Sequence, residues 1–222
     1  MMPDKDVQRI VEYCSATLNL DDVQSTDEYG YPYLALCVID AIFSIGVRYT
    51  STLNTVNRFR SYIGDPPTYS IQDLFNLYQQ ETIDGMAIRI YKNKQRTSAT
   101  NGILKAEAVL RVVDLLLRYG VENNQDMERL YENPQFEADF KEIPGQASGI
   151  SLQYFYMLTG NENTIKPDRM VVRFLEACLG RSVTSAESSS LLIQSCEMLK
   201  ENYPDLTPRT LDHEIWNFQR NQ

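Results

Sequence analysis

The apolar residues of this chain recur at the three- and four-residue spacing of amphipathic helices, and this periodicity limits the folds open to it. No stretch alternates apolar and polar residues between hairpin turns, as a surface strand would. The sequence therefore predicts an all-α fold of roughly ten helices. The predicted helices include residues 32–47, 102–119, 146–158, 168–179, 186–201 and 208–220.

Two of these helices carry start signals. Thr184 is followed three residues later by Glu187, which is the pattern of a capping box. Thr207 and Pro208 fit an N-cap residue followed by proline at the first helical position. We therefore expect helices to begin at these two places.

The length and hydropathy of the chain limit the number of its domains and disfavour a secreted or membrane-spanning protein. With 222 residues it can form one large domain or two small ones. Its N-terminus has no apolar core of the kind found in signal peptides. The longest near-apolar run, residues 34–47, is too short to span a bilayer and contains Asp40. We expect a cytoplasmic monomer that does not bind membranes.

The cysteines do not form a metal-binding pattern. Cys14, Cys37, Cys178 and Cys196 stand far apart, and His213 is the only histidine. Zinc and iron–sulfur sites need clustered ligands. We therefore predict four buried free thiols and no metal site.

The net charge of −9 disfavours non-specific binding of nucleic acid by the whole surface. Residues 88–111 are basic despite the negative net charge of the chain, since Glu107 is their only acidic residue. Such a stretch is either a solvated face or a local anion-binding face. Its basic residues are Arg89, Lys92, Lys94, Arg96, Lys105 and Arg111.

The segment IPGQASGIS, residues 143–151, lies between two predicted helices. Gly145 and Gly149 permit positive φ angles and a close approach of the backbone. Amides exposed in such a turn beside a helix N-terminus suit a phosphate oxygen. A glycine-rich turn that merely connects two helices has the same composition, so the segment alone does not decide between these interpretations.

Asp168 follows Pro167 at the start of the helix predicted for residues 168–179. One interpretation is a structural N-cap, in which the carboxylate binds free amides and the positive end of the helix dipole. The other is a functional acid, because the same place stabilises a carboxylate that faces a cation or aligns a water molecule.

The order of these motifs resembles the helix-hairpin-helix DNA glycosylase superfamily. IPGQASG is similar to its hairpin, and the Pro-Asp of TIKPDRMVVRF to its catalytic aspartate. LCVIDAIFSIGVRYTSTLNTVNRF and NGILKAEAVLRVVDLLL resemble its pocket-lining and pre-hairpin helices. The resemblance spans about residues 31–180 and implies one domain, residues 1–222, made of two helical lobes.

In that family the hairpin amides grip the DNA backbone, often through a bound monovalent cation, and the target nucleotide is flipped out of the duplex. The aspartate then stabilises the oxocarbenium-like sugar while the N-glycosidic bond breaks. The resemblance assigns this role to Asp168. It also makes the basic stretch a DNA-backbone face.

The departures from the family pattern refine this reading. Bifunctional members have a lysine where this chain has Gly149, so the resemblance implies a monofunctional reaction that leaves an abasic site. Ala147 replaces a hairpin glycine, and the iron–sulfur cysteines of the endonuclease III branch are absent from residues 197–222. Some members of the family push a glutamine into the base stack that the flipped base has left. The matching position in this chain is near Gly46, so Arg48 or Tyr49 is the candidate for this wedge. Glycine at positions 46 and 149 leaves room for a bulky modified base.

Asp40 is either an ordinary surface or hydrogen-bonded acid, or a pocket residue that accepts from a flipped base. Tyr29, Tyr31 and Tyr33 either pack in the core or stack on that base. The predicted DNA contacts are Ile143, Gly145, Gln146, Ala147, Ser148, Gly149, Lys92, Lys94, Arg96, Lys105 and Arg48. The predicted base pocket comprises Asp40, Ser44, Tyr49, Tyr31 and Tyr154.

The leading hypothesis is a monofunctional DNA glycosylase whose partner is double-stranded DNA with a damaged or modified base, including modified bases of phage DNA. Two alternatives stay open. A non-catalytic DNA-binding or interaction module would keep the fold. A lyase would use Lys166 or Lys105 as its nucleophile.

Overall fold

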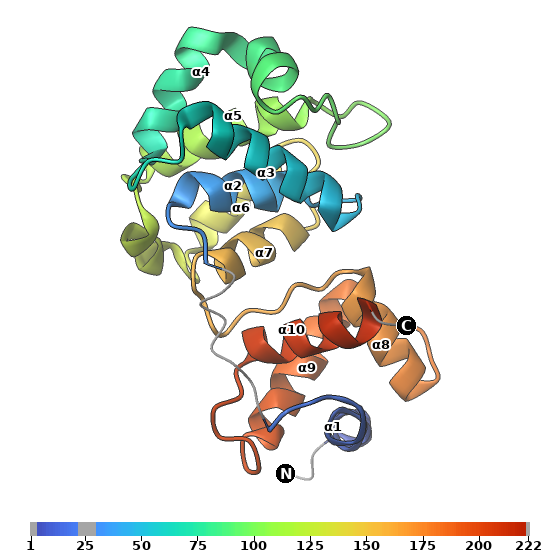
Figure 1. The fold of residues 1–222 in the computed structure, drawn as a ribbon. Helices are drawn as coiled ribbons and strands as arrows, with labels where there is room; N and C mark the ends of the chain where they lie inside the picture. Colours follow the sequence, from blue (N-terminus) through green and yellow to red (C-terminus); the bar gives the residue numbers. More distant parts are fainter. Residues whose placement is uncertain (1–3, 22–29, 221–222) are drawn as a thin grey trace. The chain divides into compact units, whose positions relative to one another are not determined.

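The computed structural model describes residues 4–21 and 30–220, and over these residues the protein is all-helical, as predicted (Figure 1). The described part contains ten α-helices, one π-helical turn and one 3-10 helix. Its only strand-like pairing is an isolated antiparallel bridge between Arg96 and Leu104. No helix in the described ranges is long and apolar enough to cross a membrane.

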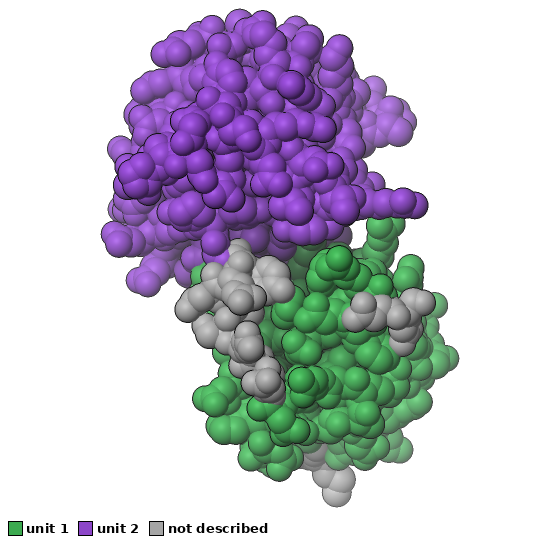
Figure 2. Space-filling model, viewed as in Figure 1, with its two compact units in different colours: residues 1–29, 160–222 green, residues 30–159 purple. Residues whose placement is uncertain are grey.

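The chain divides into two compact units (Figure 2). Unit 2 is continuous and comprises residues 30–159. Unit 1 combines residues 1–29 with residues 160–222, so the two ends of the chain belong to the same unit. Each unit has its own buried apolar cluster.

Unit 2 is built around helix α2 (Leu34–Phe43), whose ten residues are all buried. This helix is apolar on every side apart from Asp40, which explains why it can lie within the core rather than on the surface. Helices α3, α5 and α7 pack against it. The elements of the unit, besides α2, are α3 (Tyr49–Ile63), α4 (Ile71–Gly85), η2 (Met86–Ile90), α5 (Lys105–Arg118), η3 (Asn124–Leu130), α6 (Pro134–Glu142) and α7 (Ile150–Leu158).

Unit 1 contains α1 (Lys5–Thr17), α8 (Arg169–Leu179), α9 (Ser185–Leu199) and α10 (Pro208–Arg220). Helix α1 packs against α8 and α9, and α10 packs against α8 and α9. Buried Ile10, Phe174 and Leu211 are part of the core they share. A segment from the beginning of the chain thus completes a core formed otherwise by its end.

The helix starts that carry capping signals in the sequence are confirmed, whereas the helix predicted for residues 146–158 begins only at Ile150. Thr184 and Glu187 form a complete capping box at the beginning of α9. Helix α10 begins at Pro208, and α8 begins directly after Asp168. The helix predicted for residues 32–47 is shorter than expected, because it ends at Phe43, three residues before Gly46, which has a left-handed φ of 72°.

The four cysteines are free and buried, as predicted. The π-helical turn η2 was not expected. It follows Thr82, a non-glycine residue with a φ of 61° that interrupts regular α4 geometry. The segment after it, residues 92–104, leaves the helical region and is tied to itself by hydrogen bonds from Thr97 N–H to Ile103 O and from Lys105 N–H to Gln95 O.

Candidate functional site

The segment between α6 and α7, residues 143–149, is a tight connection within unit 2. Gln146 N–H donates to Ile143 O, and Gly149 N–H donates to Gln146 O, both at 2.9 Å. Gly145 has a φ of 89° and Gly149 a φ of 73°. The segment is therefore two successive reverse turns, and the second ends at the N-cap of α7.

The tip of this hairpin presents backbone donors. Ala147 and Ser148 are exposed, and within the described part of the chain their amides donate to no acceptor. They lie immediately before the N-terminus of α7, where the helix dipole adds positive potential. This combination suits an anionic oxygen such as that of a phosphate.

Two other predicted hairpin contacts face inward. Gln146 is 2% exposed, and its side-chain oxygen accepts from the Ser151 hydroxyl. The prediction that this side chain contacts DNA is therefore wrong for this conformation. Ile143 is also buried, at 7% exposed, and packs with the unit 2 core. Both side chains hold the hairpin against its unit, and Gly149 is buried too, so the exposed residues of the turn are Gly145, Ala147 and Ser148.

Gly145 allows the hairpin to lie close to the loop before α5. A Cβ atom at position 145 would overlap the Cβ of Thr97, and the φ of 89° would be strained for any other residue. We expect Gly145→Ala to lower the free energy of unfolding by about 1–3 kcal/mol, because the hairpin must move. Chemical denaturation checks this. Gly160→Ala, where a Cβ would meet no atom within 4 Å, is the matched control for a left-handed glycine.

The basic stretch contributes a second surface of unit 2. Lys92, Lys94 and Arg96 are exposed, and the Arg96 guanidinium donates to Gly102 O at 2.7 Å. Lys92 also lines a hollow of about 430 Å³ between α3 and η2. None of the described residues around this hollow is acidic: they are Asn54, Asn57, Arg58, Ser61, Tyr62, Arg89, Ile90 and Lys92.

Lys105 does not belong to this basic surface. It is 2% exposed, and its ammonium donates to Phe43 O at 2.9 Å and to Ile45 O at 2.7 Å. These carbonyls lie at the end of α2, where helical carbonyls lack partners within the helix. Burial lowers the pKa of Lys105 to about 8. The prediction that Lys105 contacts a phosphate is therefore wrong, and its role is to bind the end of the central helix.

Three tyrosines predicted for a base pocket come together around the carboxylate of a fourth predicted residue, Asp40. Asp40 is completely buried, and its Oδ2 accepts from the Tyr31 hydroxyl at 2.6 Å and, weakly, from that of Tyr49 at 3.5 Å. Tyr154 lies at the same place, since burial and then the charge of Asp40 raise its pKa well above the ordinary value. The same two causes raise the pKa of Tyr31.

Of the two interpretations of Asp40, this arrangement agrees with the hydrogen-bonded acid. Its carboxylate lies behind the tyrosines, so a ligand would meet the half-buried Tyr31 and the 39% exposed Tyr49 first. Tyr29 lies outside the described residues, and Tyr33 is buried against Tyr69. The Ser44 hydroxyl donates to Ala41 O and thereby caps α2.

The turn between α2 and α3 contains the candidate wedge. Arg48 is exposed and is the N-cap residue of α3. A Cβ at Gly46 would meet no atom within 4 Å, so this position is open. A Cβ at Gly149 would lie 3.1 Å from Lys141 Cε, so only one of the two glycines leaves empty space beside it.

Asp168, in unit 1, is the N-cap residue of α8. Its Oδ1 accepts from the amides of Met170 at 2.7 Å and Val171 at 3.4 Å. Its Oδ2 lies 4.0 Å from the Lys166 ammonium, and about a quarter of the side chain is exposed (26%). The structural interpretation of Asp168 is thus confirmed, while its second oxygen faces a cation rather than the helix.

A second carboxylate lies beside this turn and was missed by the sequence reasoning. Asp212 of α10 is buried, at 8% exposed, and accepts from the Lys166 amide at 3.2 Å. Its position was detectable, because Asp212 follows Leu211 and precedes Ile215 by three residues, and both of these apolar residues are buried in α10. A charged residue beside apolar residues at helical spacing is the signal, and Arg209, Thr210 and Gln219 of the same helix are buried as well.

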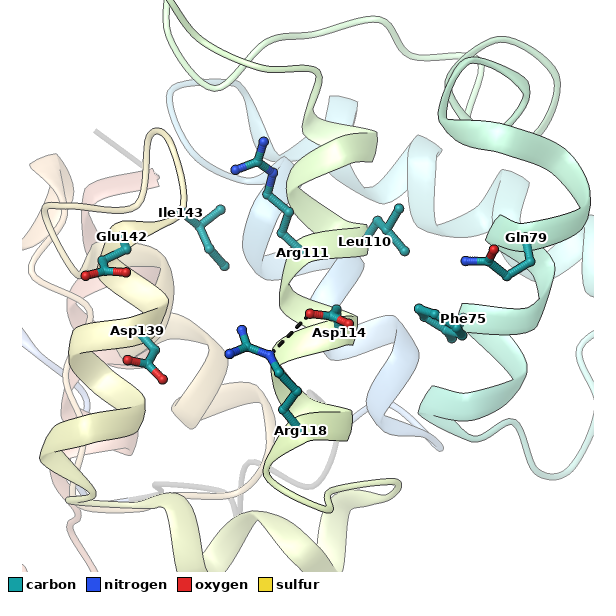
Figure 3. Close-up of a pocket in the computed structure, with 9 residues that line it drawn as sticks. All are labelled: Phe75, Gln79, Leu110, Arg111, Asp114, Arg118, Asp139, Glu142 and Ile143. Carbon is teal, nitrogen blue, oxygen red and sulfur yellow. Dashed lines mark ion pairs between the residues drawn. The ribbon is translucent and has the colours of Figure 1, made fainter.

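A pocket of about 490 Å³ lies between α4, α5 and the end of α6 (Figure 3). Arg118 pairs with Asp114 at its wall, and Arg111 pairs with Glu107. Ile143 is the only predicted site residue that lines it. The arginines of this pocket already pair with acidic residues of α5. The pocket therefore lacks the excess positive charge of the hollow beside Lys92. Nor do the described residues contain a cluster of three or more side chains suited to a metal ion.

Comparison with known proteins gives one match. A family model described as "Domain of unknown function (DUF8548)" matches residues 8–220. Neither a curated protein nor a solved structure matches the chain.

Proposed function

The chain belongs to the DUF8548 family, and from this starting point we propose that it is a monofunctional DNA glycosylase acting on a damaged or modified base. The proposal rests on the α6–hairpin–α7 turn, whose exposed amides at Ala147 and Ser148 precede a helix N-terminus. Such a turn can hold a phosphodiester without reading its sequence, which is what an enzyme needs when it meets one altered base among many normal ones.

The basic surface of unit 2 supports the same partner. Lys92 and Lys94 are exposed, and the hollow beside Lys92 adds the guanidinium group of Arg58, whereas that of Arg89 pairs with Glu81. Arg58 also donates to the carbonyls of Tyr91 and Lys92, which fixes its position. A local cationic surface on a chain of net charge −9 favours a polyanion that binds at one face.

Asp168 would supply the chemistry. Two amides and the positive end of α8 stabilise its negative charge. A carboxylate held in this way can stabilise the positive charge that develops on the sugar as the N-glycosidic bond breaks. The base leaves with the electron pair of this bond and takes up a proton. The oxygen of a water molecule bonds to the sugar carbon, and an abasic site remains.

The cluster of Tyr31, Tyr49 and Tyr154 around Asp40 would receive the flipped base. Aromatic rings offer faces on which a base can stack, and hydroxyl groups can exchange hydrogen bonds with its edge. The open space beside Gly46 makes a large modified base, such as those of phage DNA, an attractive substrate.

The experiment that tests the proposal is abasic-site formation. The protein is incubated with duplexes that carry deaminated, alkylated or oxidised bases and with phage DNA that contains modified cytosines, and strands are then cleaved with alkali. Alkali-dependent breaks on one substrate support the proposal and identify the base. Breaks that appear without alkali would indicate lyase chemistry instead, and borohydride trapping would then locate the lysine.

A non-catalytic DNA-binding module is the second candidate, favoured by glycine at position 149, where bifunctional relatives of the hairpin family have lysine. Binding of DNA that contains an abasic analogue separates the two. A glycosylase should prefer the analogue to plain duplex, because the analogue resembles the flipped state. Equal affinity for both, with no base release, would favour the module.

We expect Lys92→Ala with Lys94→Ala to weaken DNA binding equally for all sequences and to lower the slope of log K against log salt by about two, since each lysine would neutralise one phosphate. Titrations by fluorescence anisotropy at several salt concentrations measure this. Arg111→Ala with Arg118→Ala is the matched control, because it removes the same charge from residues that already have acidic partners. Equal losses in both double variants would mean that only net charge matters.

A further inference from the structure

A residue of α10, Asp212, binds the turn that carries Asp168. Asp212 Oδ1 accepts from the amide of Lys166 at 3.2 Å, and the carbonyl of Lys166 accepts from the amide of Asp168 at 2.7 Å. Pro167, which lies between them, has no amide hydrogen and a restricted φ. The backbone of Lys166 therefore links the Asp212 carboxyl group to the backbone amide of Asp168 through consecutive hydrogen bonds.

The two acids also interact electrostatically with each other and with Lys166. The Lys166 ammonium lies 4.0 Å from Asp168 Oδ2. Burial, followed by the charge of Asp168, raises the pKa of Asp212 to about 8, while Lys166 acts in the opposite direction. At neutral pH a pKa of about 8 favours the protonated form of Asp212.

We propose that Asp212 is the positioning residue for Asp168: its buried carboxyl group accepts from the Lys166 amide and thereby anchors the Lys166–Asp168 turn to α10. This inference rests on the proposed function as far as catalysis is concerned. The coupling between the two acids is a property of unit 1 that exists with or without activity.

The first test does not need activity. Between about pH 4 and pH 8 the folded protein holds a proton on Asp212 that the unfolded chain has lost, so the free energy of unfolding should fall as pH rises through this range. Asp212→Asn, which cannot ionise, should reduce this slope. In carboxyl NMR titrations, Asp168→Asn should lower the titration midpoint of Asp212, because a neighbouring charge is removed. The same midpoint in wild type and Asp168→Asn would overturn the coupling.

The second test uses base release. We expect Asp212→Leu, which has a similar size but no acceptor for the Lys166 amide, to lower kcat at least about tenfold. Asp212→Asn keeps an acceptor and should restore most of this loss. The wild-type rate should decline as pH rises through about 8, and Asp212→Asn should lack this decline. Asp205→Asn, at an exposed position of the same unit, is the control that should behave as wild type.

The outcomes separate the two proposals. A coupled titration without base release on any substrate would support the carboxyl pair and reject the glycosylase. Base release with equal kcat in Asp212→Leu and wild type, or with the same pH profile in Asp212→Asn and wild type, would support the glycosylase and reject the positioning role.

Discussion

Replacing Asp168 with asparagine is expected to lower the rate of base release by about 10²–10⁴-fold while leaving the protein folded and able to bind DNA. Asparagine is as good an N-cap residue as aspartate, so its side-chain oxygen can still accept from the amides of Met170 and Val171. Only the negative charge is lost. Single-turnover excision and binding titrations on the substrate found in the panel measure the two effects separately.

The control for Asp168→Asn is Thr184→Ala, which removes the N-cap of α9 in the same unit. It should cost about 1 kcal/mol of stability and leave the excision rate unchanged. A folded Asp168→Asn protein that releases the base at the wild-type rate would remove Asp168 from the mechanism, and the N-cap would then be its entire role.

Replacing Lys105 with methionine is expected to lower the free energy of unfolding by about 2–4 kcal/mol. Methionine fills a similar volume, but the carbonyls of Phe43 and Ile45 lose the ammonium that bonds both of them. These groups end the fully buried helix α2, where water cannot easily replace the lost donors. Denaturant unfolding monitored by circular dichroism measures the loss.

Lys141→Met is the matched control, because Lys141 is an exposed lysine that pairs only with Glu137 on its own helix. It should change stability by less than about 0.5 kcal/mol. Folded Lys105→Met protein should bind DNA with the wild-type salt dependence. A lower salt slope would restore Lys105 as a phosphate contact and contradict its assignment as a cap of α2.

Several helix starts and one turn of this protein can be predicted from residues that lie close together in the sequence. Helices α8, α9 and α10 begin where Asp168, the Thr184–Glu187 pair and Pro208 predict, because capping involves residues within one turn of each other. The turn at residues 143–149 also follows from Pro144, Gly145 and Gly149, whose φ preferences are local. Local signals of this kind are readable without knowledge of the fold.

Burial and partners across the chain were decided by tertiary structure. Lys105 and Arg96 belong to one basic stretch, yet one is enclosed beneath the end of α2 and the other is exposed. The sequence does not distinguish them, because the carbonyls that bind Lys105 come from about sixty residues earlier. Asp212 likewise acquires its environment only when α10 meets the turn before α8.

By itself, then, the sequence determined the helical class, the helix starts and the hairpin, since these depend on periodicity and on residues close together in the chain. Only the tertiary structure decided which charged side chains are surface groups and which are buried anchors. The physical reason is that the free energy of a charge depends on its solvation and on its nearest partners, and packing brings those partners from distant segments.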